Sequence, residues 1–157
     1  MKKIRIYVDT SVIGGCLDLE FMEWSNGLLQ DFLNGVYLPI LSELTLREVA
    51  HAPLQVQSIL ARLRIKAAEI VQVTLEMQDL ADAYLQRGIV TRKYEDDALH
   101  IAIATVCNAD IVVSWNFKHI VHFEKIQRFN AVNLEMGYKA IAIHSPREVA
   151  SYGNQGS

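Results

Sequence analysis

Hydrophobic residues follow two different spacings along the chain, and together these predict a protein in which strands and helices alternate. Short runs rich in aliphatic and β-branched residues predict strands at residues 4–8, 36–41, 70–73, 111–114 and 140–143. Apolar residues spaced three or four positions apart predict helices at residues 16–33, 43–51, 53–66, 75–87 and 96–108. Strands separated by helices usually pair in parallel, with helices on both faces of the sheet. We therefore expect an α/β fold, with a loop between the last two strands.

Residues that cap or stop helices mark several of these boundaries. Ser42 and Thr74 are hydroxyl residues placed to cap the helices that follow them. Pro53 breaks one helix and starts the next, and Gly88 ends the fourth helix. Residues 10–15 contain two hydroxyl residues and two glycines, so we expect a turn there.

Length and composition indicate one ordinary globular domain. The chain has 157 residues, and we expect a single domain over residues 1–150 and a flexible C-terminal tail at 151–157. The net charge of −3 provides no overall attraction to nucleic acid, so such contacts must come from local patches. Cys16 and Cys107 are too few for a disulfide framework. Without a signal peptide or a run of about 18 apolar residues, we expect a cytoplasmic protein that does not enter the membrane.

Acidic residues recur at the ends of the predicted strands and at helix starts. Asp9 directly follows the first strand, Glu48 lies in the helix after the second, and Asp96 and Asp97 begin the helix before the fourth. Asn116 follows the fourth strand. The carboxyl ends of parallel strands meet at one edge of a sheet, where ligands bind. Carboxylates gathered there repel each other unless a hard cation such as Mg²⁺ or Mn²⁺ neutralises them. The pattern therefore predicts a divalent metal site.

Each acid also has a simpler interpretation when it is taken alone. Asp9 and Asp97 suit turns or helix caps, and Glu48 suits a solvated helix face. Glu43 is another candidate for the acid assigned to Glu48. Its place in the first turn of a helix is, however, already explained by the helix dipole. Asp110 precedes the fourth strand and so belongs at the opposite edge of the sheet.

Two other site classes remain open at this point. Glu48 with His51 and Asp97 with His100 are carboxylate–histidine pairs three residues apart, as in di-iron helix bundles, but the strand content argues against a bundle. Both histidines are therefore interpreted as core, surface or supporting residues rather than ligands. A phosphatase or phospho-receiver domain would also begin with a strand ending in Asp. Such a phosphatase usually has a second acid at the position of Ser11, which argues against it. A receiver needs a lysine near the site after a late strand, and Lys118, just past the fourth strand, keeps that alternative open.

Four segments in order, at residues 6–13, 42–48, 97–104 and 113–120, resemble the successive motifs of a PIN domain. The resemblance covers about residues 3–150 and is nearest to VapC-type toxin ribonucleases and their stand-alone relatives. It implies a three-layer α/β/α fold around a five-stranded parallel sheet of order 3-2-1-4-5. It also implies a metal-dependent nuclease acting on RNA.

Carried over by position, the resemblance assigns Asp9, Glu48 and Asp97 as catalytic residues that bind Mg²⁺ or Mn²⁺. Ser114 matches a hydroxyl that helps to hold the site together. The fourth acidic position of the family is usually Asp and is Asn116 here, which removes one charge and weakens any second metal position. The implied reaction is hydrolysis of a phosphodiester by metal-activated water, leaving 5′-phosphate and 3′-hydroxyl ends.

Polar and basic residues near the same edge are candidates for substrate contacts. The proposed substrate-binding residues are Thr10, Ser11, Arg47, Lys93 and Lys118. Arg92 is a further candidate for a phosphate contact, and Trp115 is a candidate for stacking on a base.

A toxin of this type would form a homodimer and bind an antitoxin protein besides RNA. Leu17, Phe21, Trp24 and Leu28 form an apolar stripe that we assign to the core, although it would also suit a partner. The main alternative to a ribonuclease is a catalytically weak PIN-like domain that binds RNA or a protein.

Overall fold

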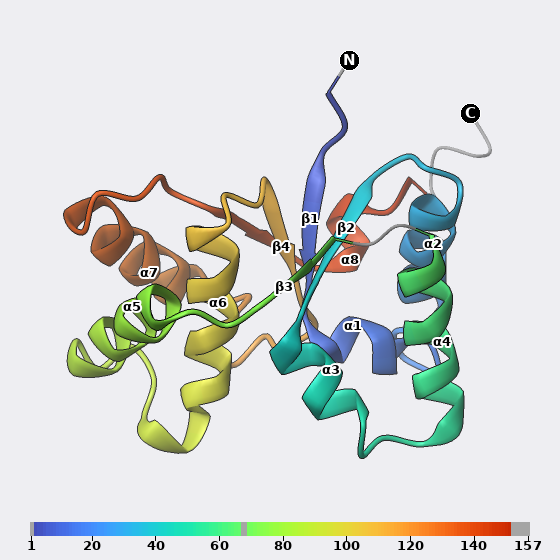
Figure 1. Cartoon of the computed structure of the whole chain (residues 1–157), viewed down its shortest axis with the longest axis horizontal. Coiled ribbons are helices and arrows are strands. Elements are labelled where there is room, and N and C mark those ends of the chain that lie inside the picture. Colours follow the sequence, from blue (N-terminus) through green and yellow to red (C-terminus); the bar gives the residue numbers. More distant parts are fainter. Residues whose placement is uncertain (1, 67–68, 152–157) are drawn as a thin grey trace.

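Five short parallel strands form the centre of the molecule (Figure 1). The structure, a computed structural model, describes residues 2–66 and 69–151. Its strands are β1 (Arg5–Val8), β2 (Leu38–Ser42), β3 (Glu69–Val71), β4 (Ile111–Val113) and β5 (Ala142–His144). They pair in parallel in the order β3-β2-β1-β4-β5. This result confirms the predicted fold class and the strand order that the PIN resemblance implied.

Helices cover both faces of the sheet, as Figure 1 shows. One face carries α1 (Thr10–Gly15), α2 (Met22–Leu33) and α4 (Leu54–Ile65), and the other carries α5 (Leu75–Gln86), α6 (Glu95–Val106) and α7 (Phe123–Glu135). Successive residues of a strand point to opposite faces. In β1, Ile6 and Val8 therefore pack with the α1–α2–α4 layer, while Tyr7 packs with the α5–α6–α7 layer. Two separate cores hold the three layers together.

Helix α3 (Glu43–Val49) begins without a loop after β2, at the edge where the strands end. The Ser42 side chain caps it by accepting a hydrogen bond from the Thr45 backbone N–H, as predicted. Helix α1 begins in the same way directly after β1. The first turn of α6 lies at this edge too, preceded by a short 3₁₀ helix, η1 (Arg92–Tyr94). Three elements thus bring polar side chains to one end of the sheet.

The segment between β1 and β2 differs from its prediction. Residues 10–15 form helix α1 instead of a turn, and the helix predicted from residue 16 begins only at Met22. Asp9 explains the first difference, because its side chain accepts from the Ser11 backbone N–H and starts a helix. The assignment of the apolar stripe to the core was wrong for Leu17, which is 49% exposed in the link between α1 and α2.

The loop predicted between the last two strands contains a helix, α7, which the sequence pattern did not reveal. Its buried face mixes Phe129 and Val132 with Asn133, which is fully buried and accepts a hydrogen bond from the Tyr84 hydroxyl. The Asn130 side chain accepts a hydrogen bond from the Ile141 backbone N–H and donates one to the Ile141 C=O, beside β5. Amides that pair inside the fold replace apolar residues on this face and hide its helical spacing. A short helix, α8 (Pro146–Val149), was also not predicted.

The C-terminal segment is anchored further along the chain than its prediction as a flexible tail implied. Ser151, assigned to the flexible tail, is held by Asp31, which accepts from its backbone N–H at 2.8 Å and from its hydroxyl. The rest of that tail, residues 152–157, lies outside the described residues.

Cys16 and Cys107 are both free thiols, and burial raises the pKa of Cys16 to about 11. Within residues 2–66 and 69–151, no helix combines the length and apolarity needed to cross a membrane.

Candidate active site

Two of the three predicted acids converge on a single nitrogen atom, Nε2 of His100. This atom lies 2.7 Å from Glu48 Oε1 and 3.4 Å from Asp9 Oδ1. Asp9 directly follows β1, Glu48 lies on α3 and His100 lies on α6, so three elements meet at this point. The geometry shows that the Asp9 and Glu48 carboxylates can share one cationic partner.

His100 is the centre of a buried polar chain. Its Nδ1 lies 2.6 Å from the Tyr7 hydroxyl, which lies 2.8 Å from the Ser42 hydroxyl. Burial alone lowers the pKa of His100, but Tyr7 and the charges of Asp9 and Glu48 outweigh it and raise that pKa well above 6.5. The raised pKa favours the doubly protonated ring, in which Nε2 donates to Glu48 and Nδ1 donates to Tyr7. In that form His100 supplies the positive charge that the two acids require.

Hydroxyl groups fix the two acids in place. Asp9 Oδ2 accepts from the hydroxyls of Ser11 at 2.6 Å and Ser114 at 2.8 Å, and Glu48 Oε1 accepts from the Thr10 hydroxyl at 2.7 Å. Burial raises the pKa of Glu48, but bonds from His100 and Thr10 reverse this and lower it overall. Thr10 and Ser11 thus orient the acids here, and their expected contact with substrate remains a prediction.

Asp97 borders the pair, and its charge is poorly compensated. Burial and then the charge of Asp9 raise the pKa of Asp97 to about 6, against the opposing effects of His100 and a hydrogen bond with Asn116. Asn116 Oδ1 accepts from the backbone N–H groups of Lys118 at 3.2 Å and His119 at 2.9 Å. The Asn116 amide is therefore compatible with Asp97, whereas a carboxylate at position 116 would add another repulsion.

We expect Asp97→Asn to stabilise the metal-free protein at pH 8. The folded pKa of about 6 exceeds the ordinary 3.8, so the folded state loses stability relative to the unfolded state as the pH rises between these values. Removing that charge should raise the free energy of unfolding by about 1–3 kcal/mol at pH 8 and by much less at pH 4. Denaturant unfolding in EDTA would measure this, with Asp96→Asn as the exposed neighbouring control. Equal gains in both variants would contradict the assignment.

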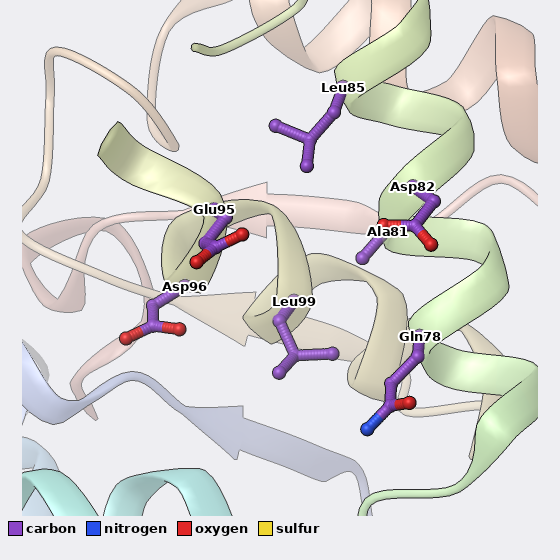
Figure 2. Close-up of a pocket in the computed structure, with 7 residues that line it drawn as sticks. All are labelled: Gln78, Ala81, Asp82, Leu85, Glu95, Asp96 and Leu99. Atoms are coloured by element: carbon purple, nitrogen blue, oxygen red, sulfur yellow. The ribbon is translucent and has the colours of Figure 1, made fainter. Parts of the chain in front are cut away.

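Asp96 and Asp97, adjacent in sequence, face different surroundings. Asp96 lines an open pocket of about 280 Å³ between α5 and α6 (Figure 2). The other residues lining this pocket are Gln78, Ala81, Asp82, Leu85, Glu95 and Leu99. Asp97 lies instead near Asp9, Glu48 and His100, whose charges act on its pKa.

The donor set suits a hard cation, but the described residues do not form a complete cage for one. Among residues 2–66 and 69–151, no group of three His, Cys, Asp or Glu side chains is arranged to hold an ion. Mg²⁺ commonly takes only one or two carboxylates, and water and substrate phosphate fill its other positions. Asp9 and Glu48, which already converge on one cationic nitrogen, meet that smaller requirement.

The basic candidates are exposed, whereas Trp115 is packed. Arg47, Lys93 and Lys118 are solvent-exposed, and Arg92 pairs with Glu95 at 3.3 Å. The prediction that Trp115 could stack on a base was wrong, because its ring is 7% exposed. That ring stacks on Phe21 at 4.2 Å, and its indole N–H donates to Ser25. His51, which was not expected to be a ligand, is exposed.

Comparison with known proteins gives a likeness in fold. No protein-family model and no curated protein matches the sequence. The structure matches a chain in the crystal structure of VapBC2 from Rickettsia felis bound to a DNA fragment from their promoter, with a TM-score of 0.58. The match covers 90% of this chain and 98% of the other, at 15% sequence identity. The chain therefore has the PIN-like, VapC-like fold that its sequence motifs indicated.

Proposed function

We propose that this protein is a metal-dependent endoribonuclease of the PIN/VapC type, which hydrolyses RNA phosphodiester bonds. The observation that carries the proposal is the convergence of Asp9 and Glu48 on one cationic point, with Asp97 beside them. Such a cluster at the carboxyl ends of parallel strands is where an α/β sheet binds its ligands. The likeness of the fold to a VapBC chain supports the same conclusion.

In this proposal Asp9, Glu48 and Asp97 hold Mg²⁺ or Mn²⁺. A bound divalent ion lowers the pKa of its water and neutralises charge on a phosphoryl group. Ser11 and Ser114 fix the orientation of Asp9 through their hydroxyl hydrogen bonds. Thr10 and Asn116 act in the same way on Glu48 and Asp97.

Degradation of a mixed RNA pool tests the function. Purified protein should cut the pool with Mn²⁺ or Mg²⁺ and stop when EDTA is added, leaving 5′-phosphate and 3′-hydroxyl ends. Products with 2′,3′-cyclic phosphate ends, or cutting that survives EDTA, would refute metal-dependent hydrolysis. A phosphatase in place of a nuclease would release inorganic phosphate without shortening the RNA.

A second candidate, a PIN-like domain that binds RNA or a protein with weak catalysis, is favoured by two features. His100 Nε2 already lies 2.7 Å from Glu48 and 3.4 Å from Asp9, so an ion must compete with it for these carboxylates. Asn116 offers a neutral oxygen, and that oxygen already accepts two backbone N–H groups.

We expect Asn116→Asp to separate the two candidates. The added charge should strengthen Mn²⁺ binding about 10-fold, because affinity for hard cations rises with ligand charge. The same charge should lower the melting temperature in EDTA, since it repels Asp97. Calorimetric titration and the RNA assay measure both effects. Cleavage that appears only in the variant would favour the weak domain for the natural chain, and strong cleavage by both proteins would favour the nuclease.

We also propose that the chain forms a homodimer and binds an antitoxin-like protein in the cytoplasm. Exposed Leu17, Leu19 and Phe117 provide apolar surface for a partner, at 49%, 93% and 49% exposure. The free thiols of Cys16 and Cys107 fit a reducing compartment. Light scattering after gel filtration tests dimer formation, and a monomer at every concentration would exclude it.

A further inference from the structure

A cationic and aromatic cluster lies beside the proposed nuclease site. The Nζ atoms of Lys93 and Lys118 lie over the ring of Tyr94, at 5.6 and 5.9 Å from its centroid. The ring of His119 packs against Tyr94 with its centroid 3.9 Å away. We call these four residues the Tyr94 platform. It gathers residues from η1 and from the loop after β4.

The two lysines of the platform attract an anion. Both are exposed, and within the described part of the chain neither forms an ion pair with a carboxylate. Two ammonium groups near one ring repel each other, and an anion bound between them would relieve that repulsion. Lys125 differs, because its Nζ already donates to the Ile89 carbonyl at 2.7 Å. Lys93 and Lys118 are therefore placed to take up a negative group from outside.

His119 has unused hydrogen-bonding capacity in the same place. His119 is 9% exposed, and both of its ring nitrogens are buried and have no hydrogen-bond partner within the described residues. Leaving such a group unpaired costs about 1–3 kcal/mol, so it usually has a reason. Burial and the charges of Lys125 and Lys118 lower the pKa of His119, which keeps the ring neutral with one N–H to donate. A phosphate oxygen is a suitable acceptor.

The platform is connected directly to Asp97. Tyr94 is the N-cap residue of α6, and Asp97 lies in the first turn of that helix. On the other side, Asn116 bonds Asp97 through its side chain and accepts from the backbone N–H groups of Lys118 and His119. A strand of RNA bound at the carboxylates would therefore run next to the platform.

We propose that the Tyr94 platform is a phosphate clamp that binds the RNA backbone next to the bond that is cut. Lys93 and Lys118 contact the phosphate, and Tyr94 holds their side chains over its ring. His119 donates its N–H when the side chains that cover its ring move aside to admit the phosphate. This inference rests on the proposed ribonuclease function and adds a specific substrate subsite to it. The clamp recognises the backbone and so tolerates any base.

Metal-free binding of a fluorescein-labelled oligouridine tests the clamp apart from catalysis. Lys93→Gln and Lys118→Gln should each weaken binding about 5-fold at 0.1 M salt, and the double variant about 25-fold. Each should also reduce the slope of log affinity against log salt by about 0.7. Lys139→Gln changes an exposed lysine in the loop before β5, away from the platform, and is the matched control. Oligoadenosine should give the same ratios.

His119→Phe tests the remaining contact with two readouts. The variant keeps the ring beside Tyr94 and removes the unpaired nitrogens, so its melting temperature should stay level or rise while RNA binding weakens. Binding that is unchanged in His119→Phe and in the double lysine variant would overturn the clamp. Lysine-dependent binding without any metal-dependent cutting would uphold the clamp and refute the nuclease. Metal-dependent cutting that is unchanged in the double lysine variant would uphold the nuclease and refute the clamp.

Discussion

Asp9→Asn should reduce metal-dependent RNA cleavage by about 10³-fold or more while the protein remains folded. Asp9 is the acid at which β1, α1 and the loop after β4 meet, and one of its oxygens faces the point shared with Glu48. The amide keeps an oxygen that accepts from Ser11 and Ser114 but removes the charge that a hard cation requires. Losing a ligand of a catalytic ion removes most of its stabilisation of the transition state.

Initial cleavage rates of a labelled RNA at saturating Mn²⁺ measure this effect. Circular dichroism and a melting curve in EDTA establish that the variant is folded. Asp82→Asn is the matched control, because Asp82 lines the open pocket between α5 and α6 and should keep full activity. If Asp9→Asn and Asp82→Asn cut RNA equally fast, Asp9 does not bind the catalytic ion.

His100→Leu should destabilise the metal-free protein by about 3–5 kcal/mol, because it removes one partner of a buried charge cluster. Asp9 and Glu48 would then face each other without compensation, and the Tyr7 hydroxyl would lose a bond at 2.6 Å. Since a divalent cation would occupy the same charged position, Mn²⁺ should stabilise the variant more than the natural protein.

Denaturant unfolding with and without Mn²⁺ measures both parts of this prediction. Tyr7→Phe is the control for the hydroxyl alone and should cost about 1–2 kcal/mol. The folded pKa of His100 lies above 6.5, so its contribution is complete below that pH and is lost as the pH rises through the folded pKa. Equal stabilisation of His100→Leu and the natural protein by Mn²⁺ would show that His100 and the ion do not share a position.

Much of the fold was predictable because the central strands are local apolar runs. In β4, for example, Val112 and Val113 are fully buried. Helix α7 was missed because Asn130 and Asn133 take positions on its inner face, and their amides pair with groups distant in sequence. Long-range pairing of polar groups leaves no local signal. Helix α1 was missed for a different reason, because its two hydroxyl residues and two glycines are typical of a turn.

The candidate site was predictable only as far as strand ends determine it. The ends of β1 and β2 and the start of α6 placed Asp9, Glu48 and Asp97 at one edge. The bridging role of His100 depends on a contact across 52 residues, although its spacing from Asp97 did place both on one helix face. The same limit applies to Trp115, because its packing against Phe21 joins residues that are far apart in the sequence.

The most direct test of the central claim is parallel incubation of the natural protein and Asp9→Asn with one end-labelled RNA, each with Mn²⁺ and with EDTA. Only the natural protein with Mn²⁺ should cut the RNA, and its fragments should carry 5′-phosphate ends. Equal cutting by the two proteins, or an intact RNA with a folded natural protein that binds Mn²⁺, would contradict it.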